Sequence, residues 1–183
     1  QVYNNTILTF NKAQYQGISF KNWGGGDWSS NNEIYNNLFY ALGTISTHHD
    51  AVRGTQQGNI VRDNLYYGNI QPSVADIDAV QDNPRLVNPN LSADFITFLS
   101  SQPSWDQLLQ EVAKRFKVGY ASAAISEGSV IGQNGGFDLF AHTVSSTALP
   151  TIGAHEYVGD NYVDSDNDKI PDVWEVSYGS HCN

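Results

Sequence analysis

The chain contains 183 residues, which is enough for one domain with a buried core. Its 19 acidic and 9 basic residues give a net charge of −10, which argues against a nucleic-acid partner because phosphate contacts need clustered lysine and arginine. No apolar run approaches the roughly 18 residues of a membrane span. The acidic composition, rich in Asn, Ser, Thr and Gly, favours a secreted, extracellular or cell-surface protein.

Three segments in the first third of the chain share one pattern. They are VYNNTIL from Val2, IYNNLFY from Ile34 and VRDNLYY from Val61. Each has an aliphatic residue, an asparagine three positions later, and an apolar or aromatic residue two positions beyond. Asparagine tolerates left-handed backbone, and its amide can bond to an asparagine on the next turn of chain. The pattern therefore predicts stacked turns with an asparagine ladder and an apolar interior. A β-sandwich with Asn-Asn hairpin turns is the alternative.

Two loops between these repeats contain candidate ligand-binding and catalytic residues. In FKNWGGGDWSS, Trp23 and Trp28 flank three glycines, and their rings can either stack on sugars or pack on the strands. In STHHDAVRG, His48, His49 and Arg53 are residue types that act as base or charge-stabilising cation in a lyase of uronate sugars. Surface histidines without chemistry are the alternative for this second loop.

One helix is predicted near residues 105–117. Ser104 and Gln107 form a capping box before it, and Gly119 is the expected stop. Its apolar residues recur at helical spacing and predict one face that packs on the end or flank of the strands: Trp105, Leu108, Leu109, Val112 and Phe116.

Several ordered landmarks resemble one known family. The run NNEIYNNLFYALG through GNIVRDNLYYGN is followed by DNPRLVNPNL (82–91), GYASAAISEGSVI (119–131) and PTIGAHEY (150–157). This order resembles secreted right-handed parallel β-helix proteins of the pectin-lyase-like type, although Tyr120, Ser122 and Thr151 depart from the usual residues. The resemblance implies an all-β fold. Residues 1–91 would be the last coils of a right-handed parallel β-helix and 92–158 a cap with one α-helix. Upstream coils or neighbouring subunits would adjoin the first coil.

The tail, residues 159–183, contains the acidic stretch DSDNDKIPDVWE. Its oxygen ligands have the spacing of an EF-hand-type loop, and the stretch resembles thrombospondin type 3 repeats, so we expect a structural Ca²⁺ site. Lys169 replaces the usual glycine and weakens this prediction, and a solvated acidic tail is the alternative. The expected ligands are Asp164, Asp166, Asp168, Ile170 (through its carbonyl), Asp172 and Glu175.

Three further residues bear on processing. Asn4 and Asn90 begin Asn-x-Ser/Thr sequons, where N-glycans are expected in a secreted protein. Cys182 is the single cysteine, either a free thiol or half of a disulfide with a partner outside this chain.

The resemblance implies association with a polysaccharide or cell-surface glycan. The most direct activity is that of a polysaccharide lyase, and a glycoside hydrolase is less well supported. The alternative is an extracellular structural, adhesive or fibre-forming solenoid protein without catalysis. Fold alone does not separate these two functions.

Overall fold

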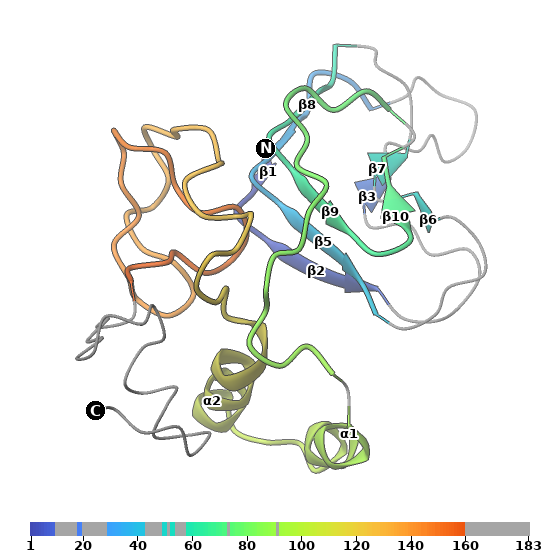
Figure 1. Ribbon diagram of the computed structural model, residues 1–183, viewed down its shortest axis with the longest axis vertical. Helices are drawn as coiled ribbons and strands as arrows, with labels where there is room; N and C mark the ends of the chain where they lie inside the picture. The colour runs from blue at the N-terminus through green and yellow to red at the C-terminus, as the bar shows by residue number, and fades with distance from the viewer. Residues whose placement is uncertain are drawn as a thin grey trace, which may run out of the picture.

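The computed structural model describes residues 1–9, 18–19, 29–42, 49–50, 52–53, 58–72, 74–90 and 92–159. These residues form a group of short strands, two helices and a long irregular segment, residues 117–159 (Figure 1). The irregular segment, coloured yellow to orange, lies beside the first strands. No helix among the described residues has the length and apolar character needed to cross a bilayer.

The described strands form four small parallel sheets. The first sheet has the order β1 (Val2–Tyr3), β4 (Glu33–Tyr35), β8 (Ile60–Arg62). The second has the order β2 (Thr6–Thr9), β5 (Leu38–Ala41), β9 (Leu65–Tyr67). The two remaining sheets pair β3 (Ile18–Ser19) with β7 (Val52–Arg53), and β10 (Ile70–Gln71) with β6 (His49–Asp50).

The predicted alignment of the three repeats is confirmed. Equivalent positions lie side by side in the sheets, as in the pairs Val2–Ile34, Ile34–Val61, Ile7–Phe39 and Phe39–Tyr66. The aromatic rings of Phe39 and Tyr66 stack with centroids 5.2 Å apart. Each repeat is therefore one turn of chain that lies on the next.

The predicted all-β, right-handed parallel β-helix is wrong. The strands form separate sheets of two or three strands that do not join into one closed or solenoidal sheet, and two helices accompany them. Three asparagine repeats specify how neighbouring turns stack, but strands of two to four residues do not determine how the sheets close. The hairpin sandwich is also excluded among the described strands, because every strand pair is parallel.

Two apolar clusters hold the strands together. One lies between the sheets and includes Ile34, Phe39 and Val61. The other joins Leu38 and Leu65 to the helices and the irregular segment, through the side chains of Phe95, Phe116, Val118 and Ile152. Burial of these large side chains supplies most of the driving force for this arrangement.

The last turn of strands is covered by the chain that follows it. Ile77 and Val80 bridge to Arg62 and Leu65 in parallel register, and Val80 N–H donates to the Asn64 carbonyl at 2.9 Å. The outer edges of β8 and β9 are therefore paired.

The predicted helix is confirmed as α2 (Trp105–Phe116), with the capping box of Ser104 and Gln107. One detail of the prediction is wrong: Trp105 is 64% exposed and not part of the packed face. The helix also ends at Phe116, whereas Gly119 serves a close backbone approach, since a Cβ there would lie 2.8 Å from the Arg85 carbonyl oxygen.

A second helix, α1 (Ala93–Ser100), precedes α2 and was not predicted. Its sequence, ADFITFLS, contains β-branched and aromatic residues that favour strands in isolation. The Ser92 side chain accepts from the Phe95 N–H at 3.2 Å and caps the first turn. Burial of Phe95 against Phe116 then decides the helical conformation.

Candidate functional site

A cleft of about 520 Å³ lies between the first turn of chain and the irregular segment. Amide, hydroxyl and carboxylate side chains line it together with a few apolar ones, and no described Lys, Arg or His does. The lining residues are Tyr3, Asn4, Asn5, Thr6, Asn134, Phe137, Asp138, Leu139, Val144, Thr151, Gly153, Ala154 and Glu156. A polar, acidic cleft of this kind suits a neutral or hydrogen-bond-donating ligand.

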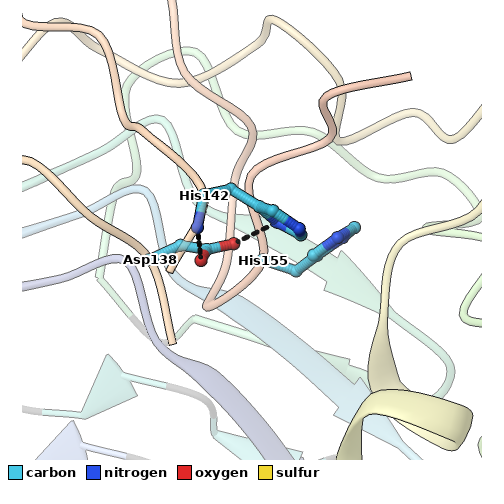
Figure 2. Close-up of side chains that lie close together, drawn as sticks. All are labelled: Asp138, His142 and His155. Carbon is cyan, nitrogen blue, oxygen red and sulfur yellow. Dashed lines mark hydrogen bonds and ion pairs between the residues drawn. The ribbon is translucent and has the colours of Figure 1, made fainter. Parts of the chain in front are cut away.

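Asp138 holds the wall of this cleft together. Its Oδ1 accepts from the backbone N–H groups of Phe140 at 2.7 Å and His142 at 2.8 Å. Its Oδ2 accepts from the Glu156 N–H at 2.7 Å and lies 3.1 Å from His142 Nδ1 (Figure 2). One carboxylate therefore shapes the 138–142 turn and ties it to residue 156.

Asp138, His142 and His155 form the one group of potential metal ligands among the described residues. Their ligand atoms lie within 4.8 Å of one another, and the two histidine rings are 5.3 Å apart, edge to face (Figure 2). Transition metals bind such groups through unprotonated imidazole nitrogens. The hydrogen bonds of the cluster determine whether such nitrogens are available.

The His155 side chain forms a structural hydrogen bond with the backbone. Its Nδ1 accepts from the Val118 N–H at 3.0 Å, so the neutral ring carries its proton on Nε2 and offers no free lone pair. Burial, with Lys117 nearby, lowers the pKa of His155 to about 4. Because both Asp138 oxygens also accept hydrogen bonds, we interpret the cluster as an anchor for the cleft wall. Its composition alone does not make it a metal centre.

Glu156 contributes a second carboxylate to the cleft. Its Oε2 accepts from the Thr151 N–H at 3.1 Å, and the Thr151 hydroxyl accepts in turn from the Tyr157 N–H at 3.0 Å. Burial raises the pKa of Glu156 above its ordinary value. With Asp138, this residue makes the cleft unfavourable for an anionic ligand.

The predicted asparagine ladder is confirmed beside the cleft. Asn5 Nδ2 donates to Asn37 Oδ1 at 2.9 Å, and Asn37 Nδ2 donates to Asn64 Oδ1 at 3.0 Å. Asn64 Nδ2 then donates to Asp76 Oδ2 at 2.8 Å, which was not predicted. The ladder thus runs from a partly exposed amide to a carboxylate.

Asp76 closes this ladder in a partly buried site. Its Oδ2 also accepts from the Tyr66 hydroxyl at 2.5 Å, whereas its Oδ1 is buried and has no partner. Burial raises the pKa of Asp76 to about 6. A carboxylate has no N–H to pass on, so the ladder ends here.

The residue before each ladder position has left-handed backbone. Asn4, Asn36 and Asp63 have φ of 54°, 57° and 52°. The Asn36 side chain binds the backbone of the irregular segment through two hydrogen bonds. Its Nδ2 donates to the Ser129 carbonyl at 2.8 Å, and its Oδ1 accepts from the Ser129 N–H at 2.7 Å. Asn4, one turn away, lines the cleft, and its buried Oδ1 has no partner.

Two of the predicted catalytic residues, His49 and Arg53, lie in different short strands. His49 lies in β6, which pairs with β10, and Arg53 lies in β7, which pairs with β3. His48, Trp23 and Trp28 lie outside the described residues, as do the six predicted calcium ligands, Asp164, Asp166, Asp168, Ile170, Asp172 and Glu175, and also Cys182. Those predictions stay predictions.

The sequence interpretation missed the residues that shape the cleft. Asp138 and His142 are four apart in DLFAH, and His155 follows in IGAHEY, which was assigned only to the family resemblance. Such spacing occurs by chance in many chains, so it gave no usable signal. Asp76 was also not predicted, although its carboxylate accepts from the last asparagine of the ladder.

No family model matches this sequence, and no curated protein matches it significantly. The function must therefore be argued from the site.

Proposed function

We propose that this chain is an assembly domain of an extracellular structural or adhesive protein. It accepts one more turn of chain, from the same or a neighbouring polypeptide, along the outer edges of β1 and β2. The observation that carries this proposal is the asparagine ladder, which is open at Asn5 and closed at Asp76.

The ladder has a repeating donor and acceptor arrangement. Asn37 Oδ1 accepts two bonds from the turn before it, from Asn5 N–H at 3.2 Å and Asn5 Nδ2 at 2.9 Å. Asn64 Oδ1 likewise accepts from Asn37 N–H at 2.9 Å and Asn37 Nδ2 at 3.0 Å. Asn5 Oδ1 occupies the same position in the first turn, and no described residue donates to it. It is an acceptor placed for one more turn of chain.

The unpaired edges of β1 and β2 lie at the same end of the scaffold as Asn5, the open end of the ladder. Among the described residues, β1 and β2 pair on one side only, with β4 and β5. Val2 is 37% exposed, whereas Ile34 beside it is fully buried. An unpaired edge with an exposed apolar residue is a template for strand addition.

At the opposite end of the scaffold, the described edges of β8 and β9 are paired and so are not templates for strand addition. Residues 77 and 80 bridge to β8 and β9, and Asp76 ends the ladder there. Assembly through this scaffold therefore has one available direction.

Hydrogen exchange with a peptide probe tests the proposal. The probe is the nine-residue peptide EIYNNLFYA, which copies residues 33–41 of this chain. In the chain alone, we expect amides of residues 2–9 to exchange faster than those of β4 and β5. Saturating peptide should slow exchange at residues 2–9, and a scrambled peptide of the same composition should not.

Two results would reject strand addition. One is full protection of residues 2–9 in the chain alone, which would show that the edge is already covered. The other is unchanged exchange at every peptide concentration.

The lining of the cleft favours a second candidate, binding of a neutral polysaccharide. Phe137 is 66% exposed at the cleft, where an aromatic ring can stack on a sugar, and the exposed Asn5 lines the same cleft with an amide oxygen to which no described residue donates. The carboxylates of Asp138 and Glu156 oppose uronates, so this site supports binding of neutral sugars better than uronate lyase chemistry.

Affinity electrophoresis in gels containing neutral or uronate polysaccharides tests this second candidate. Neutral polysaccharide should retard the chain, and Phe137→Ala should abolish the retardation. Trp105→Ala is the matched control, because Trp105 is an aromatic residue of similar exposure (64%) on α2, away from the cleft lining. Equal loss in both variants, or retardation by uronates alone, would reject binding in the cleft.

A further inference from the structure

We infer that the cleft selects sugars that carry a primary ammonium group, and that the Glu156 carboxylate binds that group. The inference rests on the second candidate function, sugar binding in the cleft, and names the substituent that the cleft prefers. The ligand class is an oligosaccharide of glucosamine-type units. All residues that carry this inference belong to the irregular segment, residues 117–159, and none lies in β1 or β2.

Glu156 has free acceptor positions at the cleft that it lines. Every hydrogen bond that its carboxylate accepts from a described residue comes from Thr151. The Thr151 N–H lies 3.1 Å from Oε2 and 3.3 Å from Oε1, and the Thr151 hydroxyl lies 3.4 Å from Oε1. A charged N–H donor usually lies closer to a carboxylate, at about 2.7–2.9 Å, and an ionised carboxylate has about four acceptor positions. Positions therefore remain for a donor in the cleft.

The charge of Glu156 has no partner among the described lysines and arginines. The ion pairs that those residues form are with Asp63 and Glu111. Burial raises the pKa of Glu156, and the Asp138 carboxylate in the same lining raises it further. A partly buried carboxylate without a cation is unfavourable, and an ammonium group from a ligand compensates for it.

Asp138, the other carboxylate of the lining, already has its hydrogen bonds. Its side chain is 4% exposed, and its oxygens accept from three backbone N–H groups at 2.7–2.8 Å in addition to the contact with His142. A buried carboxylate with these partners holds the cleft wall and offers little to a ligand. The two carboxylates therefore have different tasks, and Glu156 is the one that binds the ligand.

Phe137 supplies a second contact for such a sugar. Its ring is 66% exposed in the cleft lining, and the bridge between Phe137 and Thr143 fixes its position. The face of an aromatic ring packs on the apolar face of a sugar and also attracts cations. Lys117, whose Nζ lies 4.9 Å from the centroid of the Phe140 ring, does not line the cleft, and neither does any other described lysine.

Calorimetric titration with a matched pair of sugars tests the inference on the ligand side. The β-1,4-linked trimers of glucosamine and of glucose differ at one position of each ring, which carries an ammonium group or a hydroxyl group. At pH 6, we expect the glucosamine trimer to bind about tenfold more tightly, the effect of one charge-assisted hydrogen bond. Equal affinities would overturn the inference and leave sugar binding standing. Failure of both trimers would instead reject sugar binding in the cleft.

Two variants test the inference on the protein side. Glu156→Gln removes the charge, while the side-chain oxygen can still accept from the Thr151 N–H. Its matched control is Glu127→Gln, because Glu127 is exposed on the same irregular segment, does not line the cleft and gives the same change in net charge. We expect Glu156→Gln to bind the glucosamine trimer about tenfold more weakly and the glucose trimer as before. Equal losses in both variants would show that overall charge attracts the sugar, and would overturn the role of Glu156.

A peptide of three lysines tests whether the cleft recognises the sugar ring as well as the charge. The peptide brings ammonium groups without a sugar ring, so we expect it to bind about tenfold more weakly than the glucosamine trimer. Phe137→Ala should remove that difference. Equal affinity of peptide and sugar for the unmodified chain would overturn the assignment to an amino sugar.

The same titration on the longest native form of the protein tests whether the cleft is open there. We expect the same affinity for the glucosamine trimer. Binding by these 183 residues alone would show that other residues of the protein fill the cleft, and would overturn the assignment.

Discussion

The two ends of the asparagine ladder differ in the side chain that they present and in the backbone position from which it reaches the ladder. At one end, Asn5 is exposed and presents an amide oxygen beside a cleft. At the other, Asp76 lies in the chain that follows the last strands and presents a carboxylate that accepts from Asn64 and Tyr66. The same row of amides is thus open at an amide oxygen and closed by a carboxylate that reaches it from a different backbone position.

The largest expected effect comes from breaking the middle of the ladder. Asn37 is fully buried and donates to the Tyr35 and Val2 carbonyls as well as to Asn64. Asn37→Ala leaves several buried groups unpaired, so we expect the free energy of unfolding in urea to fall by about 4 kcal/mol. A loss no larger than that of Asn5→Ala would show that the ladder contributes little to stability.

Acid should weaken the cleft wall at the open end. The pKa of His155 is lowered to about 4, so the unfolded chain takes up a proton between pH 6.5 and 4 while the folded chain does not. The contribution of neutral His155 is present above pH 6.5 and lost as the pH falls toward 4, by about 3 kcal/mol.

His155→Asn is the variant for this measurement, because its side-chain oxygen can still accept from Val118 without titrating. Chemical denaturation from pH 4 to 8 should show a shallower acid loss in the variant. Parallel pH profiles of the two proteins would contradict the assignment to His155.

The closed end should respond to pH in the opposite direction. The pKa of Asp76 is raised to about 6, so the folded chain holds a proton that the unfolded chain releases above pH 3.8. The stability contributed by this proton declines as the pH rises from 3.8 to 6, and the penalty is complete above 6. Asp76→Asn removes the charge and should stabilise the protein at pH 7.5 by about 2 kcal/mol, since the site is only partly buried.

The gain from Asp76→Asn should vanish near pH 4, where the wild-type carboxyl is protonated in the folded chain. Unfolding at pH 4 and pH 7.5 measures this difference. A variant that is destabilised at both values would show that the ionised carboxylate stabilises the closed end.

The smallest expected effect is at the open end itself. Asn5 is exposed, and its side chain donates to Tyr3 and Asn37. Asn5→Ala should lower the free energy of unfolding by about 1 kcal/mol, because water replaces part of what is lost. Asn90→Ala, at an exposed residue outside the ladder, is the control for the same urea measurement.

The sequence correctly predicted which strand residues pair and where α2 begins. It did not predict how the short sheets are arranged relative to one another, for a physical reason. The trios beginning at Val2, Ile34 and Val61 specify register, because a one-residue shift would turn every apolar side chain outward. The capping box at Ser104 specifies a helix start. No comparable local rule states whether short sheets close into a solenoid, and the β-helix prediction was wrong there.

The cleft was unpredictable for a related reason. Asp138 and His155 act through backbone groups of Glu156 and Val118, partners that no side-chain pattern identifies. Asp76 lies outside the register of the ladder asparagines, since Leu65 is opposite Val80, so no repeat of the asparagine pattern marks it. Residues that anchor backbone leave little trace in the sequence.

The ladder is also a row of aligned amide dipoles with an ionisable group at its far end. Each hydrogen bond in such a row polarises the next, so an ionised Asp76 makes the oxygens of Asn64, Asn37 and Asn5 more negative, most strongly at Asn64 and least at Asn5. Protonation of Asp76 weakens that polarisation. The attraction of Asn5 for an incoming donor therefore depends on the charge of a carboxyl group at the opposite end of the ladder, with no movement of the chain between them.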